Sequence, residues 1–288
     1  PYGGGEMSFV STGEMTRKAQ REGYAVPAFN AENLEMAQAI IQAASREGSP
    51  VILQTTLPTA RYWGMEEAVA VTASLAQEAP VPVALHLDHS NSFDEVMRAA
   101  RAGYTSLMFD GSAMPYEENL RLTGRVVEAV RPMGLTVEAE LGRVGGKEDS
   151  AAAPEAALTD PEEARAFAEE TGVGLFAPAI GTAHGFYKGE PRLDFALLGE
   201  IRGLVSVPLV LHGGSGLPDG MIRRAIGLGI AKVNFATELR AAMTAAVWET
   251  MEGDREVIDP KKYLGRGREA VERLCVEKIR LCGSNGRA

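Results

Sequence analysis

The chain has 288 residues, 45% of them hydrophobic, and its 29 Lys and Arg against 39 Asp and Glu give a net charge of −10. This acidic balance argues against a nucleic-acid partner and against a membrane-surface partner, because both require a basic face. The length exceeds that of an ordinary domain but suits one barrel of alternating strands and helices, which takes roughly 250 residues.

The cysteines and the ends of the chain indicate where the protein resides. Cys275 and Cys282 match no zinc-binding spacing and favour a reduced, cytoplasmic protein. The start, Pro1-Tyr-Gly-Gly-Gly, has no initiator methionine and no signal peptide is visible, and no apolar run approaches the ~18 residues of a membrane span. We expect one domain over 1–288, with residues 1–10 flexible or of artificial origin and a helical extension over 259–288.

Eight short apolar runs typical of strands buried on both faces recur along the chain, and a helical pattern follows each. The predicted strands are 26–30, 51–55, 83–88, 106–110, 136–140, 174–180, 209–212 and 232–235. The predicted helices are 32–46, 66–78, 93–102, 116–131, 161–171, 194–203, 219–228 and 237–251. The unbroken count of eight units favours a closed (β/α)8 TIM barrel over an open doubly wound sheet.

Local signals refine this assignment. Ser92 and Asp160-Pro161 are start signals for the helices that follow them. Segment 142–158, rich in Gly, Ala and acidic residues, is the longest predicted loop and is interpreted as a mobile lid or a disordered surface excursion. The C-terminal stretch, from Asp259-Pro-Lys-Lys-Tyr through 271–281, is an extra helical element that is expected to pack on the barrel or on another subunit.

Polar residues interrupt the apolar runs where the predicted strands end, which is where barrel enzymes place their chemistry. Core packing alone predicts apolar residues there, or polar ones scattered equally between both ends. The polar residues at this rim are Asn30, Thr55, Asp88, His89, Asp110, Glu140, His184, His212 and Asn234. Together they indicate a functional rim.

Three of the four histidines, His89, His184 and His212, follow separate apolar runs. A neutral imidazole binds a divalent ion without first losing a proton, so three of them beside the spare carboxylate of Asp88 indicate a catalytic zinc-type site with an open position. The fourth, His86, points to the same side of its strand as Asp88 and is interpreted as a supporting interior group.

The carboxylates of the rim allow more than one role. Asp88 and His89 are adjacent, so one can bind metal while the other faces substrate. Asp110 and Glu140 end the next two strands and can hydrogen-bond the histidines or hold a second cation. Each can equally be a helix cap or a salt-bridge partner.

Two glycine-rich or helix-opening turns indicate phosphate binding: His212-Gly-Gly-Ser-Gly216 and Asn234-Phe-Ala-Thr237. Barrels commonly hold phosphate in the loops after strands seven and eight, where exposed N–H groups and a helix dipole favour an anion. Lys188, just beyond His184, can supply a cation or be an ordinary surface lysine.

Five motifs in order resemble the signatures of the class II, metal-dependent ketose-bisphosphate aldolases, which include the fructose- and tagatose-bisphosphate enzymes. The motifs are Leu87-Asp-His89, Val137-Glu-Ala-Glu-Leu-Gly142, Gly181-Thr-Ala-His-Gly185, Leu211-His-Gly-Gly-Ser215 and Asn234-Phe-Ala-Thr237. The resemblance runs from about Ser11 to Cys282-Gly-Ser-Asn, nearly the whole chain. It implies reversible cleavage of a ketose 1,6-bisphosphate to dihydroxyacetone phosphate and glyceraldehyde 3-phosphate.

The resemblance also implies roles for residues. Zinc, or cobalt or another divalent ion, would be bound by His89, His184 and His212, with Asp110 and Glu140 at a second or alternative metal position. Asp88 would handle the proton of the 4-hydroxyl and Glu148 the proton at C3. Substrate and phosphate contacts would come from Asn30, Thr56, Gly185, Lys188, Gly213, Gly214, Ser215, Asn234, Phe235, Ala236, Thr237 and Lys278.

A monovalent cation near the phosphate and a homodimer or homotetramer complete the implied assembly, with Lys278 matching a basic residue that reaches across a subunit interface. Fructose-specific members often carry an acidic residue where this chain has Ala236, so the resemblance runs toward the tagatose branch. A Schiff-base route is disfavoured, because Lys232 starts the eighth predicted strand and Lys188 lies in a loop. The alternatives left open are a barrel metallohydrolase acting on a phosphorylated substrate and a non-catalytic sugar-phosphate-binding subunit.

Overall fold

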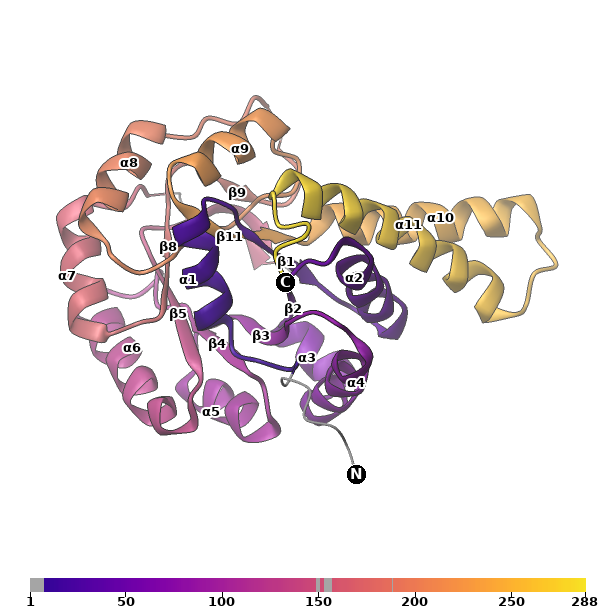
Figure 1. Ribbon diagram of the computed structural model, residues 1–288, viewed down its shortest axis with the longest axis horizontal. Coiled ribbons are helices and arrows are strands. Elements are labelled where there is room, and N and C mark those ends of the chain that lie inside the picture. The colour runs from indigo at the N-terminus through magenta and orange to yellow at the C-terminus, as the bar shows by residue number, and fades with distance from the viewer. Residues whose placement is uncertain (1–7, 149–150, 153–156, 188) are drawn as a thin grey trace.

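Eight parallel strands close into a barrel in the computed structural model, which describes residues 8–148, 151–152, 157–187 and 189–288 (Figure 1). Around the barrel the order is β1-β11-β10-β8-β5-β4-β3-β2. The strands are β1 (Val26–Asn30), β2 (Val51–Thr56), β3 (Val83–Ser90), β4 (Ser106–Phe109), β5 (Thr136–Leu141), β8 (Leu175–Pro178), β10 (Leu209–Leu211) and β11 (Ile230–Phe235). The predicted TIM barrel is therefore confirmed, and the open-sheet alternative is wrong.

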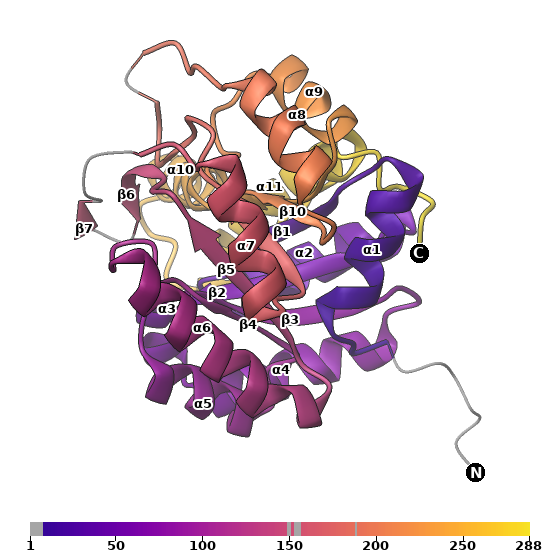
Figure 2. The same cartoon turned by 90° about the vertical axis from the view of Figure 1, so that its left-hand side faces the viewer.

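A ring of helices surrounds the strands (Figure 2). It comprises α2 (Leu34–Glu47), α4 (Met65–Glu78), α5 (Phe93–Ala102), α6 (Tyr116–Val130), α7 (Pro161–Thr171), α8 (Phe195–Leu204), α9 (Asp219–Gly227) and α10 (Thr237–Gly253). The start signals hold, because Ser92 Oγ accepts from the Glu95 N–H and the Asp160 carboxylate from the N–H groups of Glu162 and Glu163.

Several short elements were not predicted. They are α1 (Thr12–Glu22), α3 (Leu57–Trp63), the 3-10 turn Arg131–Met133, and the strands β6 (Gly145–Glu148), β7 (Ala151–Ala152) and β9 (Ala183–His184). Segment 142–158 therefore carries strands in its described part. Helix α1 was not predicted because it precedes the first strand and so lies outside the repeating strand–helix pattern.

Helix α1 closes one end of the barrel, and β6 and β7 lie at the other end (Figure 2). Its Met15 and Ala19 join a buried cluster with interior residues of the strands, among them Ile52 and Ala84. The Thr12 hydroxyl lies 2.8 Å from the Ser106 hydroxyl at the start of β4. The end that carries β6 is thus the one left for chemistry, and it is the carboxyl end of the strands.

The C-terminal extension is a long helix, α11 (Pro260–Leu281), that forms an antiparallel arm with α10 and projects from the barrel (Figure 1). Its start agrees with the predicted helical stretch from Asp259, whose side chain accepts from the Lys261 N–H and caps the helix. The end of α11 packs on α2, where Arg280 donates to Glu47 at 2.8 and 2.9 Å. This portion therefore packs on its own barrel.

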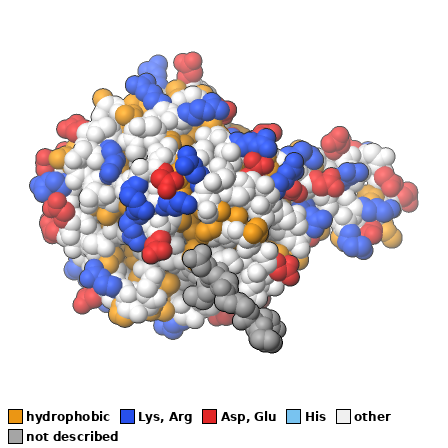
Figure 3. Space-filling model, viewed as in Figure 1, with side chains coloured by type: hydrophobic (Ala, Val, Ile, Leu, Met, Phe, Trp, Pro, Cys, Tyr) orange, Lys and Arg blue, Asp and Glu red, His pale blue; other side chains and the backbone are white. Residues whose placement is uncertain are grey.

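Acidic and basic side chains are interspersed over the face that carries α1 and along the arm (Figure 3). Among the described residues, no helix combines the length and apolar character needed to cross a membrane.

The pairing of β6 with β9 provides a test of the fold at the carboxyl end. Gly146 faces His184 in this pair and has a φ of +96°, and a Cβ there would lie within 3.0 Å of three His184 backbone atoms. We expect Gly146→Ala to loosen the small sheet by about 1–2 kcal/mol, which raises amide exchange in β6 and β9 roughly 5–30-fold. Hydrogen exchange read by mass spectrometry measures this.

The matched control is Gly199→Ala, because this exposed glycine of α8 has no atom within 4 Å of the added Cβ. It is expected to stabilise the helix by about 0.5–1 kcal/mol and to leave exchange in β6 and β9 unchanged. Equal exchange in wild type and Gly146→Ala would contradict the close packing.

Candidate active site

Three imidazoles meet at the carboxyl end of the barrel, as the sequence predicted. His89 lies near the end of β3, His184 in β9, and His212 directly after β10. One nitrogen of each lies within 4.8 Å of the others, and His89 Nε2 is 2.9 Å from His212 Nδ1. His89 has a φ of +49°, the one positive value at a non-glycine residue in the described part of the chain. The backbone at His89 is therefore strained, and this strained conformation orients the His89 ring.

Neighbouring carboxylates determine which nitrogens carry hydrogen. His89 Nδ1 lies 2.8 Å from Asp110 Oδ2, and His212 Nε2 lies 2.9 Å from Glu138 Oε1. A carboxylate only accepts, so these two nitrogens are the donors. His89 Nε2 and His212 Nδ1 then face each other with lone pairs, an arrangement that a bound cation stabilises. The donor set fits a metal ion.

Electrostatics agree with metal binding. Burial lowers the pKa of His184 and of His212 well below the ordinary value, which keeps both rings neutral and able to bind a metal. Burial alone would raise the pKa of Asp110, but the hydrogen bond and charge of His89 outweigh it and hold that pKa below the ordinary range. Asp110 therefore stays a carboxylate that orients His89.

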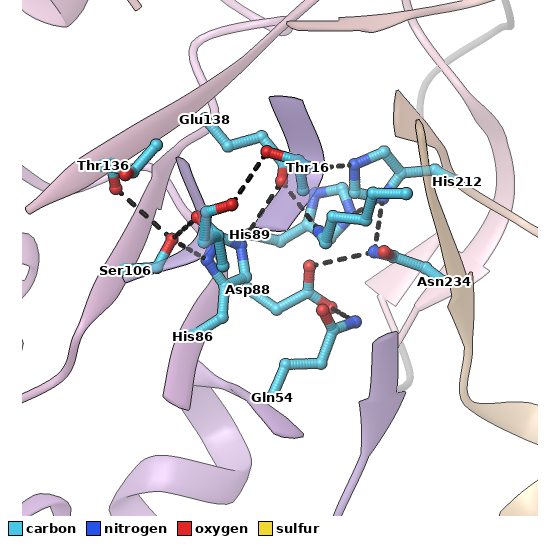
Figure 4. A network of polar contacts seen from close by, with 12 residues as sticks. Thr16, Gln54, His86, Asp88, His89, Ser106, Thr136, Glu138, His212 and Asn234 are labelled. Atoms are coloured by element: carbon cyan, nitrogen blue, oxygen red, sulfur yellow. Dashed lines mark hydrogen bonds and ion pairs between the residues drawn. The ribbon is translucent and has the colours of Figure 1, made fainter. Parts of the chain in front are cut away.

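Asp88 is almost fully buried beside the histidines and is held by three amides, of which those of Gln54 and Asn234 are labelled in Figure 4. Its Oδ2 accepts from Asn30 Nδ2 at 3.2 Å and Gln54 Nε2 at 3.0 Å, and its Oδ1 accepts from Asn234 Nδ2 at 3.2 Å. The amides come from β1, β2 and β11, so three strands fix one carboxylate. Gln54 was not predicted as a site residue. The sequence feature that could have revealed it is an amide side chain inside a run of otherwise apolar and hydroxyl-bearing residues.

Glu140 is brought to the same place. One oxygen each from Asp110 and Glu140 and one nitrogen of His89 form a second group with metal-binding spacing. Glu140 Oε1 also accepts from the Val144 N–H at 3.2 Å. Asp110 thus makes the predicted hydrogen bond to a histidine, and the pair also has the spacing for a second cation.

A small cavity opens beside the histidines at the start of α10. The lining residues are Asn30, His184, Gly185, Gly213, Ser215, Asn234, Ala236, Thr237 and Arg240. Ser215 Oγ accepts from the Ala236 N–H at 3.1 Å, which ties the loop after β10 to the start of this helix. Helix N-termini favour anions, so the predicted phosphate residues gather where a phosphate can bind.

Gly213 is required by this geometry, with a φ of +67° and a Cβ position that would meet the Ala183 backbone. Tyr187 holds the same contact, since its hydroxyl donates to the Gly213 carbonyl at 2.9 Å and accepts from the Ala183 N–H at 3.1 Å. Arg240 was not predicted because it lies one turn into a helix rather than at a strand end. Its Nε donates to Glu32 Oε1 at 2.6 Å.

The other predicted contact residues lie near the cavity but not in its lining. Thr56 caps α3, and Gly214 packs its backbone against the Asn234 carbonyl. Phe235 is buried against Phe29, with ring centroids 5.8 Å apart. Lys278 lies 5.2 Å above the Phe235 ring centroid and 2.5 Å from Glu238 of the same chain.

Two predictions fall on parts of the chain that the structure leaves undescribed. Lys188 lies outside the described residues, and Glu148 ends β6 with a side chain outside the described part. Two charged residues that sequence reasoning left out of the site, Glu138 and Lys232, are fully buried directly beneath His212. Their signal was a charged side chain inside an apolar strand.

The family described as class-II fructose-bisphosphate aldolase matches residues 10–287. A fructose-bisphosphate aldolase of Geobacillus stearothermophilus is 47% identical over 98% of this chain and 99% of its own. The YdjI aldolase of Escherichia coli K12 superposes with a TM-score of 0.87 at 39% identity, covering 97% and 99% of the two chains.

A fructose-bisphosphate aldolase from Campylobacter jejuni, 22% identical, shares the fold with a TM-score of 0.84 over 98% of this chain and 97% of its own. The match to the family and to the Geobacillus protein extends over nearly the full length, and the five motifs that suggested it all lie within the matched region. The chain therefore belongs to the class II fructose-bisphosphate aldolase family and is an aldolase, a carbon–carbon lyase.

Proposed function

We propose that the protein catalyses zinc-dependent, reversible aldol cleavage of a ketose 1,6-bisphosphate to dihydroxyacetone phosphate and glyceraldehyde 3-phosphate. The observation that carries the proposal is the meeting of three histidines and an amide-held carboxylate beside a cavity at a helix N-terminus. Three histidines with an open fourth position are typical of catalytic zinc, and cobalt suits the same ligands.

His89, His184 and His212 would hold the metal, which when bound supplies Lewis-acid stabilisation of the negative charge left by C3–C4 cleavage. Asp88 accepts the proton of the 4-hydroxyl, and Asn30, Gln54 and Asn234 keep its carboxylate in one orientation. In our proposal Glu148 transfers the proton at C3.

The lining of the cavity offers groups for the anionic parts of the substrate. The loop Gly213–Ser215 and the start of α10 offer backbone N–H groups to the phosphate of the dihydroxyacetone half, with Lys188 and a monovalent cation as further countercharge. Arg240, on the same helix, presents a guanidinium to an anionic group of the substrate. Glu32 holds this guanidinium in place.

We also propose a homodimer or homotetramer in the cytoplasm. The projecting arm exposes Trp248, Met251 and Ile258, whose exposed fractions are 67%, 43% and 90%. Large apolar side chains that gather on a projecting element favour contact with a second copy. Both cysteines are free thiols, in agreement with a reducing compartment.

Metal removal tests the first part of the proposal. Dialysis against a chelator should abolish aldol cleavage, and zinc or cobalt should restore it. His212→Ala should lose metal and activity together, because two histidines fall short of the three protein ligands that catalytic zinc normally keeps. Metal content by atomic emission and rate by a coupled assay measure this. Full activity without metal, with inactivation by borohydride in the presence of substrate, would point to a Schiff base instead.

The role of Asp88 has its own test. Asp88→Ala should keep the metal and lower kcat by about 10²–10⁴-fold, the usual contribution of a positioned acid–base group. Metal content is determined on the same preparation as the rate. If the purified Asp88→Ala variant contains no metal, Asp88 is a metal ligand and its assigned role is wrong.

Substrate preference depends on Ala236, which lines the cavity without a carboxylate. A site discriminates strongly between hydroxyl epimers only when it holds a partner for one of them, so discrimination should be about 1–3 kcal/mol. We expect tagatose 1,6-bisphosphate to be cleaved at least as well as fructose 1,6-bisphosphate. The kcat/KM values for both substrates measure this, and Ala236→Asp should shift the ratio toward fructose. A wild-type fructose preference beyond about 10³-fold would show that another residue reads C4.

A further inference from the structure

A buried ion pair lies inside the barrel directly beneath the three histidines. Glu138 of β5 and Lys232 of β11 are both 0% exposed, and Lys232 Nζ lies 2.7 Å from Glu138 Oε2. The other carboxylate oxygen, Oε1, lies 2.9 Å from His212 Nε2 (Figure 4). One carboxylate therefore joins a lysine to an imidazole of the site.

Hydrogen-bond chemistry fixes the proton on His212. Glu138 beside the lysine is an acceptor, so the hydrogen of the neutral ring must be on Nε2. The opposite nitrogen, Nδ1, receives a contact of 3.1 Å from Asn234 Nδ2, and this same amide nitrogen donates to Asp88. The carboxylate of Asp88 can only accept, so the Asn234 atom that contacts it must be the NH₂ nitrogen. This NH₂ group also donates to His212 Nδ1, which is therefore an acceptor without hydrogen. Two independent contacts give the same tautomer.

Lys232 explains how the carboxylate can remain charged in this position. A lone buried carboxylate is strongly destabilising, whereas a paired one is tolerated. Glu138 has a third neighbour, His86, whose Nε2 lies 3.6 Å from Glu138 Oε2. The other ring nitrogen of His86, Nδ1, lies 2.8 Å from Ser106 Oγ. Ser106 in turn contacts Thr12 of α1. The carboxylate is therefore held on each side by groups from other elements.

We propose that Glu138, balanced by Lys232, is a positioning residue that fixes the Nε2–H tautomer of His212 and so directs Nδ1 toward the metal. This inference rests on the proposed function only in taking His212 as a metal ligand. Carboxylates that accept from a ligand histidine typically strengthen metal binding 10–100-fold, because they orient the ring and raise its basicity. The pair thus acts on metal affinity through His212 and touches no substrate atom.

The test replaces the pair by apolar residues of similar size. In Glu138→Leu combined with Lys232→Met no buried charge is left unpaired, and such exchanges are often neutral for folding. We expect zinc affinity, measured by competition with a chromophoric chelator, to fall about 10–100-fold. In Glu138→Gln combined with Lys232→Met an uncharged acceptor remains, so we expect an intermediate affinity with the tautomer preserved.

The tautomer is determined on metal-free protein labelled with nitrogen-15 in its histidines. The chain has only four histidines, so few signals overlap in these spectra. The His212 signal is assigned by its absence in His212→Ala. Wild type and the Gln variant should show Nε2–H, and the Leu variant a mixture of both forms. Tyr104→Phe is the control, since it removes a buried 2.7 Å contact with Thr55 in the barrel wall and should leave zinc affinity unchanged.

Wild-type zinc affinity in both double variants, or an Nδ1–H form of His212 in the wild type, would overturn the proposal. Melting temperatures that fall while affinity stays constant would show a purely structural ion pair and would overturn it equally. No substrate is present in these measurements. A wild-type protein that fails to cleave ketose bisphosphates but shows the expected affinities would refute the proposed function and leave this inference standing.

Discussion

The arrangement of the site depends on two imidazole nitrogens whose lone pairs face each other 2.9 Å apart, His89 Nε2 and His212 Nδ1. Such a pair is unfavourable by itself, and it is maintained because each ring donates its only N–H to a carboxylate on the opposite side. Asp110 serves His89 and Glu138 serves His212. The geometry of the proposed metal site is therefore set by the barrel itself, at the expense of burying charge.

The strained backbone at His89 separates two tasks that adjacent residues must perform. In a regular strand, Asp88 and His89 would point to opposite faces, one into the barrel and one outward. The register of β3 against β4 shifts between Leu87 and Ser90, and the φ of +49° at His89 turns its ring back toward the axis. Asp88 can then be enclosed by three amides while His89 faces the metal position. Local strain at this point is part of how the site is formed.

The sequence predicted the repeating strands and helices, and the polar residues that interrupt the apolar strands. The eight strands were predictable from apolar runs, and the rim histidines, Asp88, Asp110 and Asn234 from polar residues at their ends. Helices α1 and α3 were missed because they fall outside the alternation, and β6 and β9 because two- to four-residue strands have no measurable period. Glu138 and Gln54 were missed because they lie inside apolar runs, where only three-dimensional pairing reveals their partners.

The same short strands connect the metal site to the loop that follows β6. His184 lies in β9 and pairs with Gly146 of β6, the strand that ends at Glu148. On its other side the backbone of Ala183 is pressed against Gly213 and held by the Tyr187 hydroxyl. A proposed metal ligand, the proposed phosphate loop and the strand that ends at the proposed C3 proton-transfer residue are thus parts of one packed unit. Glycine is required at both contacts, because a Cβ at Gly146 or at Gly213 would collide with the backbone of β9 and push the parts of this unit apart.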